Sequence, residues 1–358
     1  MTDFELARRL GRTDGGAEDA FGRVTDARLG HDGRIFVADV LAHTVLVFGP
    51  NEMLLYRLGR SGEGPGEFSG ILKLGPGERG GVRAFDQRLW RETLFDAEGS
   101  LLHVFSPPRP LVDIGQPYEV RYDGNGHLLR LSFDQFRETL LESLGGRARA
   151  VVRGLVWIDR FEEENGAWRH LLQVPSIEVY FADGGLTDRP YGRRPLWTVG
   201  PEGDVWHADS GEYRIRRLTP AGEEILEIEA KLDPVPITDE ERRTFYEVLD
   251  RPDLGEDARR RLRRNRSELD VPEFRPALRQ LIATDGGGIW VRPETAPGDD
   301  AAPARWHAYT ADGDFEGVVR LPAGFRPTHI LGNEVVGIER DSLGVSYVSV
   351  YRPARTSP

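Results

Sequence analysis

Cysteine is absent from this chain of 358 residues. Its absence excludes disulfide bonds, thiolate catalysis and cysteine-ligated zinc, and it leaves the redox compartment open. Lysine is almost absent too, because only Lys73 and Lys231 are lysine among 47 basic residues; GC-rich coding explains this bias. No stretch is long and apolar enough to span a bilayer, and 30% of the residues are charged. The composition predicts a soluble protein.

The balance of charge is acidic, with a formal net charge of -12. An acidic chain does not favour sequence-independent binding to the phosphate backbone of a nucleic acid. We therefore expect no nucleic-acid partner and a ligand that is cationic, neutral or bridged by a metal. The first residues run directly into a strand-like pattern without a signal peptide, so the chain is either cytoplasmic or follows a removed leader.

One pattern recurs four times along the chain. In the first copy, Val37-Ala38-Asp39 is followed by an apolar alternation that ends at Phe48, nine residues after the aspartate. The other copies run from Asp86 to Phe95, from Asp209 to Leu218, and up to Tyr309, and each leads into a turn. Self-similar units with a turn every ~8–12 residues are typical of a propeller or a similar array of strands.

The units predict an all-β fold, a six-bladed β-propeller with four-stranded antiparallel blades. The blades are expected at about 26–59, 70–107, 117–174, 196–230, 278–321 and 328–353. The sixth supplies only three strands, and residues 6–12 match the outer strand at 55–60, so the N-terminal strand, about 4–11, is expected to complete it. Closing the ring in this way leaves no exposed edge. The whole of 1–358 is then a single domain, although the irregular third unit leaves five or seven blades open.

Several segments resemble a known family. Residues 32–39, 45–48 and the glycine-rich 62–68 are similar to an NHL-type repeat of bacterial six-bladed β-propellers. The resemblance covers 20–105 well and 196–230 and 280–322 in part. It implies a propeller, a fold that serves binding modules and also metal-containing gluconolactonases and lactonases, strictosidine synthase-like enzymes and a peptide-amidating lyase. It also implies an extracytoplasmic place, periplasmic or secreted, with the leader missing from this chain; a cytoplasmic place is the alternative.

Four insertions interrupt the repeats, at 133–147, 176–195, 233–276 and 293–303. With the strands of each blade named a to d from the axis outward, these insertions fall in b/c loops or in connections between blades. They should therefore extend the same face, which is where binding is expected. The helical insertion, about 233–277 between blades four and five, has a capping box at Thr238 and Glu241. Its basic run at 259–264 is interpreted as a solvated helix face or a lid.

The recurring aspartates Asp39, Asp86 and Asp209 are interpreted as structural residues that bind the backbone of the following b/c turn. Familiar hydrolase and nucleotide-binding motifs are absent from the sequence. The candidate chemistry is therefore expected at the axis, where residues near the start of each strand a surround the channel mouth: Asp26, Glu119, Trp197, Arg279, Gln280 and His329.

Within this ring, Asp26, Glu119 and His329 form a candidate site for one divalent cation, calcium or zinc. The alternative is a water-filled channel whose polar residues satisfy one another, because a slip of one residue turns a side chain away from the axis. A second candidate group lies in equivalent b/c loops, where tryptophan and arginine suit a sugar, an aromatic or an anion; its members are His43, Arg88, Trp90, Arg91, Glu212 and Tyr213. Packing between blades is the alternative for each. His207 and His307, beside Trp206 and Trp306, are interpreted as packed strand histidines.

Our leading hypothesis is a binding propeller without assignable catalysis, which takes a small molecule, glycan or peptide at the channel mouth on the long-loop face. The alternative is a metal-dependent hydrolase or lactonase, or a lyase, that uses a metal-polarised water in the channel. A third hypothesis is a scaffold that docks a protein partner through the helical insertion.

Overall fold

The computed structural model describes residues 1–11, 20–109, 119–182, 185–247, 255–256, 271–295 and 302–354. Within these ranges β-strands dominate, accompanied by two α-helices and one short 3-10 helix, Glu78–Gly80. All but the first residue of the predicted second helix at 256–266, including its basic run, and most of the predicted 293–303 loop lie outside the described residues. No helix in the described part is long and apolar enough to cross a membrane.

Four antiparallel sheets of four strands follow one another along the chain. The first contains β2 (Val24–Leu29), β3 (Ile35–Asp39), β4 (Thr44–Phe48) and β5 (Leu54–Leu58). The second contains β6 (Ile71–Pro76), β7 (Val82–Asp86), β8 (Arg91–Phe95) and β9 (Leu101–Phe105). The third contains β10 (Val120–Tyr122), β11 (Leu128–Ser132), β13 (Leu155–Glu162) and β14 (Ala167–Pro175), and the fourth contains β17 (Pro195–Val199), β18 (Val205–Asp209), β19 (Arg214–Leu218) and β20 (Glu224–Glu229).

The remaining large sheet has eight strands and contains both ends of the chain. One half is β21 (Leu278–Ala283), β22 (Ile289–Pro293), β23 (Ala304–Tyr309) and β24 (Phe315–Leu321); the other is β25 (Arg326–Leu331), β26 (Glu334–Arg340), β27 (Ser346–Pro353) and β1 (Thr2–Leu10). Strand β1 pairs antiparallel with β27, with Leu6 opposite Tyr351, and parallel with β24 through Thr2 and Val319. The predicted pairing of the N-terminal strand with the last strand is therefore present.

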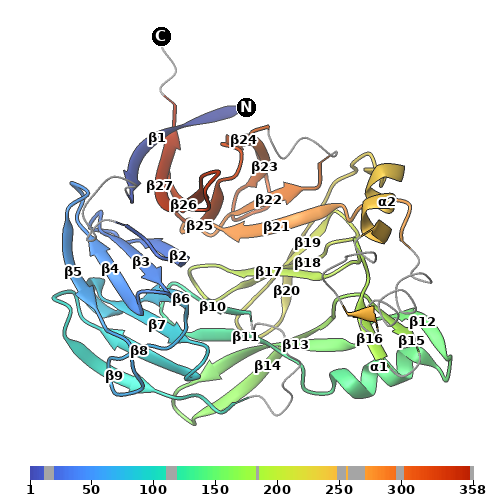
Figure 1. Ribbon diagram of the computed structural model, residues 1–358, viewed down its shortest axis with the longest axis horizontal. Coiled ribbons are helices and arrows are strands. Elements are labelled where there is room, and N and C mark those ends of the chain that lie inside the picture. The colour runs from blue at the N-terminus through green and yellow to red at the C-terminus, as the bar shows by residue number, and fades with distance from the viewer. Residues whose placement is uncertain are drawn as a thin grey trace.

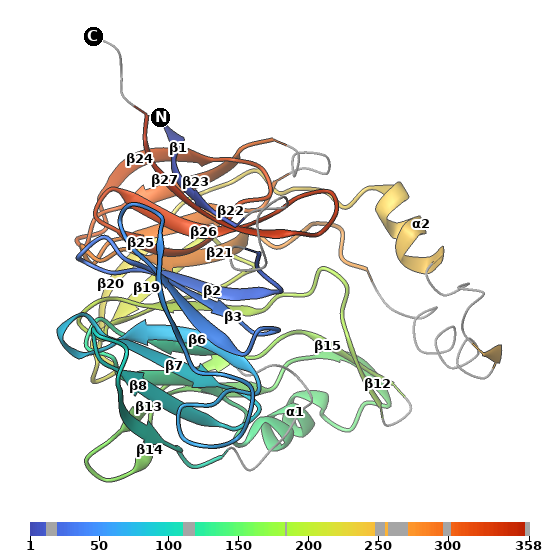
Figure 2. The same cartoon turned by 60° about the vertical axis from the view of Figure 1, so that its left-hand side comes forward.

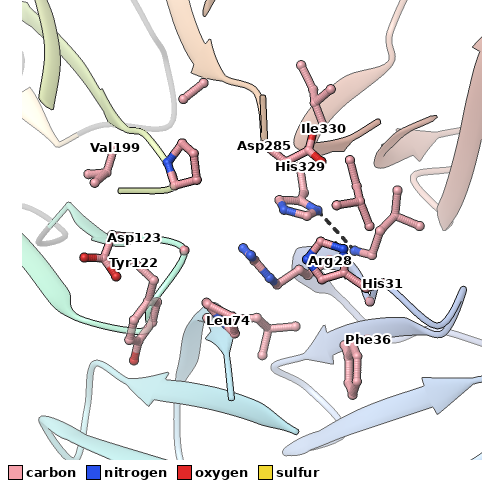
Figure 3. A pocket seen from close by; sticks show the side chains of 18 of the residues that line it. Arg28, His31, Phe36, Leu74, Tyr122, Asp123, Val199, Asp285, His329 and Ile330 are labelled. Atoms are coloured by element: carbon pink, nitrogen blue, oxygen red, sulfur yellow. Dashed lines mark hydrogen bonds between the residues drawn. The ribbon is translucent and has the colours of Figure 1, made fainter. Parts of the chain in front are cut away.

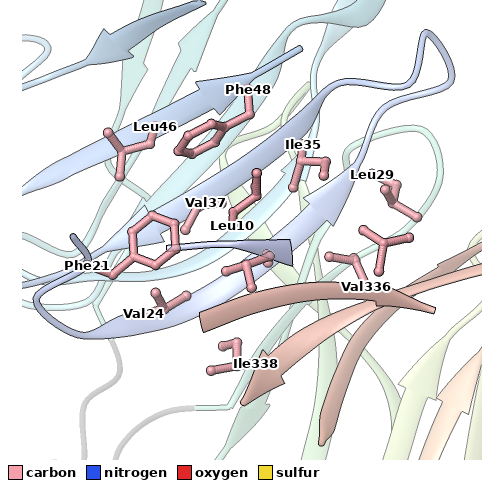
Figure 4. Packing of buried hydrophobic residues seen from close by; sticks show 13 residues of the cluster. Leu10, Phe21, Val24, Leu29, Ile35, Val37, Leu46, Phe48, Val336 and Ile338 are labelled. Atoms are coloured by element: carbon pink, nitrogen blue, oxygen red, sulfur yellow. The ribbon is translucent and has the colours of Figure 1, made fainter. Parts of the chain in front are cut away.

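The sheets are arranged around a common centre, with β2, β6, β10, β17, β21 and β25 innermost (Figure 1). In each sheet, a tight turn joins the innermost strand to the second strand. In the first sheet this turn places Gly33 at a φ of 82°, a left-handed conformation that glycine adopts without steric cost. Apolar residues then pack between neighbouring sheets: Val24 and Val37 of the first sheet meet Val336 and Ile338 of the last (Figure 4).

Repeated aspartates hold these units in register. The carboxylate of Asp39 accepts backbone N–H groups from Leu41 and Ala42 in the following turn, and from Gly22 and Arg23 in the preceding connection. Asp86 does the same for residues 88–89 and 69–70. Asp209 accepts the N–H of Gly211 and pairs with Arg153. The structural interpretation of these three residues is confirmed, and two of them also fix the chain that enters the sheet.

Two of the predicted loops contain ordered structure and assemble with each other. Helix α1 (Phe136–Leu144) lies in the first insertion and β12 (Arg149–Val152) follows it directly, while β15 (Val179–Ala182) and β16 (Gly185–Asp188) lie in the second insertion. The three strands form one sheet in the order β12-β15-β16, and α1 covers it with a shared apolar core. We call this unit the insertion module. It lies on the same side of the molecule as helix α2 (Asp239–Glu247), as Figure 2 shows.

Helix α2 begins as the sequence predicts. The N–H of Glu241 donates to the Thr238 hydroxyl at 3.2 Å, and the Glu241 carboxylate accepts the N–H of Thr238 at 2.9 Å. This reciprocal pair is a capping box. The long insertions that the structure describes therefore extend one face, as expected.

Candidate functional site

Two cavities lie between the innermost strands. A cavity of about 560 Å³ is on the face of the insertion module, and we call it the loop-side cavity. A second cavity of about 620 Å³ is lined by the turns between innermost and second strands, and we call it the turn-side cavity (Figure 3). Five residues line both cavities, and we call them the waist: Lys73, Arg121, Thr198, Ile282 and Thr328. The two cavities are thus halves of one channel.

The register of the innermost strands determines which residues face the channel. Each turn is closed by a backbone bond such as Gly30 N–H to Arg34 carbonyl, and the equivalent donors are Gly77, Asp123, Gly200 and Thr284. The residues two positions before these donors all line the turn-side cavity: Arg28, Gly75, Arg121, Thr198 and Ile282. Four positions before are Asp26, Lys73, Glu119, Leu196 and Gln280, and all but Leu196 line the loop-side cavity. This spacing of two is the alternation of a β-strand.

Lys73 is bound to a single carboxylate at the waist. Its Nζ lies 3.0 Å from Oδ1 of Asp26, and the other Asp26 oxygen accepts the N–H of Leu74 at 2.9 Å. The Asp26 side chain is only 4% exposed, whereas the Lys73 side chain is 23% exposed. Burial lowers the pKa of Lys73; Asp26 opposes this effect, and the nearby guanidinium groups of Arg121 and Arg28 add to it.

The guanidinium of Arg121 is fixed by contacts with residues of the channel wall. It donates to the Val120 carbonyl at 3.0 Å, lies 3.4 Å from the Glu119 carboxylate and stacks 5.2 Å from the centre of the Trp197 ring. Trp197 in turn donates to Glu119 at 2.9 Å. Glu119 therefore positions both the aromatic ring and the cation that covers it.

Arg28 projects into the turn-side cavity (Figure 3). Among the described residues, no carboxylate lies within ion-pair distance of its guanidinium. Burial lowers the pKa of Arg28 to about 10, and Asp26 only partly opposes this effect. The channel therefore concentrates three cationic side chains, Arg28, Lys73 and Arg121, around one buried carboxylate. Other carboxylates of the turn-side wall have partners of their own: Asp32 binds Arg34, Asp123 binds His127, and Asp285 accepts the N–H of Gly332.

The predicted metal ligands are not brought together. Asp26 and Glu119 line the loop-side cavity, but His329 lines the turn-side cavity. Its Nδ1 accepts the N–H of Leu29 at 3.3 Å, and burial together with the nearby cations Arg28 and Lys73 holds its pKa well below its usual value. Strand β25 has a β-bulge between Pro327 and His329, and β2, β6 and β21 have one at the equivalent place, before Asp26, Lys73 and Gln280. Among the described residues, no group of three His, Cys, Asp or Glu side chains is placed to hold a metal ion.

The loop residues predicted to bind a ligand are mostly packing residues. Trp90 is buried edge-on against Phe85, and Arg91 donates to the backbone carbonyls of residues 63, 64 and 67. Tyr213 is buried and bonded to Tyr309 and His307. Packing between blades, the alternative named for these residues, describes the contacts of Trp90 and Tyr213 with the neighbouring sheets, and His307 is a packed strand histidine as expected.

The other predicted residues have separate surroundings. His43 occupies its turn at a φ of 54°, and Arg88 packs over Gly70. Glu212 is exposed and lies 3.9 Å from Arg214, and Arg279 lies 3.7 Å from Glu294. None of these four residues lines the channel. Of the nine residues predicted to bind a ligand, Gln280 alone lines the loop-side cavity, and Trp197 contributes by supporting Arg121.

Sequence reasoning missed the channel cations Arg28, Lys73 and Arg121. Two signals were available for them. Lys73 is one of only two lysines in the chain, and it stands at the same distance before its turn as Asp26 does in the first unit. Counting back from every turn by two and four residues would have found all three.

Comparisons with known proteins support the fold. No family model matches the chain, and no curated protein matches it. Among solved structures, a member of the DUF4221 family from Bacteroides vulgatus is similar with a TM-score of 0.53 and 8% identity, over 99% of this chain and 98% of that one. A catalytically inactive virginiamycin B lyase from Staphylococcus aureus with quinupristin has a TM-score of 0.45 and 12% identity, over 97% and 99%.

A gluconolactonase from Xanthomonas campestris has a TM-score of 0.45 and 8% identity, over 98% and 99% of the two chains. The similar structures are β-propeller proteins, and they do not single out NHL repeats. With such low identities the likeness concerns the fold alone. The chain is therefore similar to β-propeller proteins over nearly its whole length.

Proposed function

We propose that this chain is a six-bladed β-propeller that binds an anionic small molecule in its channel. The blade count is supported by four separate four-stranded sheets and by two four-stranded halves of the eight-stranded sheet. The site is the waist together with the loop-side cavity, whose volume of about 560 Å³ is in the range of ligand pockets. The ligand class is a carboxylate or a phosphate.

The guanidinium of Arg28, which has no ion-pair partner among the described residues, carries this proposal. Arg28 is partly buried, and a cation withdrawn from water without a paired counter-charge is unfavourable unless a ligand supplies that charge. Lys73 and Arg121 approach the same space, and guanidinium groups match carboxylate and phosphate geometry with two parallel hydrogen bonds. The expectation of a cationic or neutral ligand, drawn from the net charge, is therefore replaced by one of an anion.

The insertion module supports entry from its own face. Phe133, Ser176, Ile177 and Asp188 of the two insertions line the loop-side cavity, beside Arg194 and Arg326. Apolar wall and charged rim occur together there, so an anion with a small apolar part suits the cavity. Its size is too small for an extended glycan or peptide.

Calorimetric titration with inorganic phosphate, citrate and glucose tests the proposal. We expect at least one of the two anions to bind and the neutral sugar not to bind. Replacing this cation in Arg28→Met should weaken binding by ~10-fold or more and, unusually for a binding residue, raise Tm, because a partly buried charge that lacks an ion-pair partner among the described residues is removed.

The matched control is Arg60→Met, because the Arg60 side chain is 81% exposed. This variant should change neither affinity nor Tm. Arg121→Met provides a second channel variant, also expected to weaken binding. Failure of both anions to bind, or equal weakening by Arg60→Met and Arg28→Met, would contradict an anion site in the channel.

Two further predictions from the sequence concern the cellular location of the protein and its helical insertion. Fractionation of the native cell with an antibody checks the extracytoplasmic place, which a purely cytoplasmic signal would overturn. Capture of a protein partner that is lost on deletion of 238–276, with the remaining protein still folded, is the test of the scaffold hypothesis.

A further inference from the structure

We infer that the Lys73 amine forms an imine with the carbonyl group of its ligand, which makes the ligand a 2-oxo acid or a similar carbonyl-bearing anion. This inference rests on the proposed function, because the channel cations are what would hold the carboxylate of such a ligand. The reacting amine of Lys73 and the cations that bind the carboxylate then lie in the same part of the channel.

The geometry places the amine where a ligand can reach it. Lys73 lines both halves of the channel. Its single hydrogen-bond partner within the described part of the chain is Asp26. Because Asp26 is itself fixed by the Leu74 N–H, it is a positioned proton acceptor rather than a mobile counter-ion. A nucleophile beside a base that a third group orients is the usual arrangement of covalent catalysis.

The surroundings of Lys73 lower the pKa of its ammonium group. Burial and two neighbouring guanidinium groups lower its pKa, and only Asp26 acts in the other direction. A desolvated lysine beside another cation is a recognised way to activate an amine for attack on a carbonyl. An anionic ligand at Arg28 and Arg121 would offset part of this effect, but it would also place its carbonyl next to the amine.

The reaction balances without any other reactant. The Lys73 ammonium passes a proton to Asp26, and the neutral amine attacks the carbonyl carbon to form a C–N bond. Asp26 then protonates the carbonyl oxygen, takes a proton from nitrogen, and returns it to the hydroxyl group. Water leaves and a protonated C=N bond remains, so that ammonium plus carbonyl gives iminium plus water, with Asp26 ionised again.

The identity of the residue matters, because an arginine at this position remains charged and cannot form this bond. The chain contains 47 basic residues and only two lysines. Lys231 is exposed in the connection that follows β20, and therefore serves as an internal reference amine. The two lysines differ in environment and not in chemistry.

Reductive trapping tests the inference on the full-length protein. Pyruvate is added as the probe with sodium cyanoborohydride near neutral pH, and the labelled site is located by peptide mass spectrometry. We expect a stable adduct on Lys73, formed at least ~10-fold faster than on Lys231 because of the activated amine; the N-terminal amine also reacts near neutral pH, and peptide mapping separates its adduct. Asp26→Asn should slow trapping, and acetone, which lacks a carboxylate, should react much more slowly than pyruvate.

The controls separate this inference from the proposed function. Lys231→Arg should leave the adduct unchanged, and Lys73→Arg should remove it. If Lys73 is not labelled, or is labelled no faster than Lys231, while propionate still binds in a manner that depends on Arg28, the imine is wrong and the anion site stands. If pyruvate and propionate do not bind but phosphate or citrate does, the imine is wrong and the anion site stands; if none of the four anions binds, both ideas fail. Locating the labelled lysine in the protein without substitutions tests the imine even where a variant does not fold.

Discussion

Asp86 is a fully buried residue whose carboxylate accepts four backbone N–H groups. We predict that Asp86→Ala lowers the free energy of unfolding by about 3 kcal/mol, because charged acceptors are lost and buried donors remain unpaired. Urea unfolding followed by circular dichroism measures the change. Asp96→Ala is the control, since the Asp96 carboxylate accepts the N–H groups of residues 98 and 100 in an exposed turn; an equal loss in both variants would contradict the prediction.

Single residues differ in how far a sequence predicts them. Asp39 and Asp86 recur at one position of the repeat, so their recurrence indicated a shared structural role. Arg28, Lys73 and Arg121 are not shared between units, and their meaning depends on the strand register. His329 shows the difficulty directly, because Pro327 and Thr328 line the loop-side cavity and the next residue, His329, lines the other half of the channel.

At the scale of elements, the insertion module depends on two neighbouring leucines that have opposite surroundings. Leu140 is 6% exposed in the module core with Val152 and Val179, whereas Leu141 is 51% exposed. We predict that Leu140→Ala costs the module ~2–3 kcal/mol through a cavity, and that Leu141→Ala costs almost nothing. Amide exchange of β12 and β15 measures this local stability; equal protection in the two variants would overturn the packing described for α1.

Elements were predictable where the chain repeats itself. The similarity of residues 6–12 to the outer strand at 55–60 identified β1 and its partner, and the capping box identified the start of α2. Strands β15 and β16 lie in a segment predicted as a loop, and β12 was not distinguished from the strands of the third unit, because four residues are too few for a clear alternation. The pairing of β12 with β15 also joins two separate segments of the chain, and local sequence carries no signal for such a contact.

At the scale of the whole molecule, β1 joins the two halves of the eight-stranded sheet. Leu10 lies in the core between the first and last sheets, and Phe4 contacts Trp290 edge-on at 5.6 Å. We predict that deleting 1–10 lowers Tm by well over ~10 °C or causes aggregation, because two strand edges are exposed. Calorimetry and light scattering check this outcome.

A synthetic peptide of residues 1–11 should restore part of the lost stability when it is added in trans. Glu5→Gln is the control: it removes only the exposed pair with Arg352 and should leave Tm almost unchanged. A deletion variant as stable as the intact chain would contradict the role of β1 in holding the sheet together.

The net charge of -12 describes the whole molecule and not its channel. Composition averages over a surface on which acidic residues predominate, whereas three cations occupy the channel interior. The propeller fold could be predicted from the repeats, but the sign of the charge in the channel could be predicted only with the register of five innermost strands. A ligand class is therefore a local property that composition does not report.

The waist belongs to the walls of both cavities. A molecule held there faces an exit on each side of the protein, so closing one mouth with a lid would not trap it. Its residence time then depends on the bonds made at the waist itself. A covalent bond to Lys73 would be the most direct way to retain a small ligand in a passage with two openings.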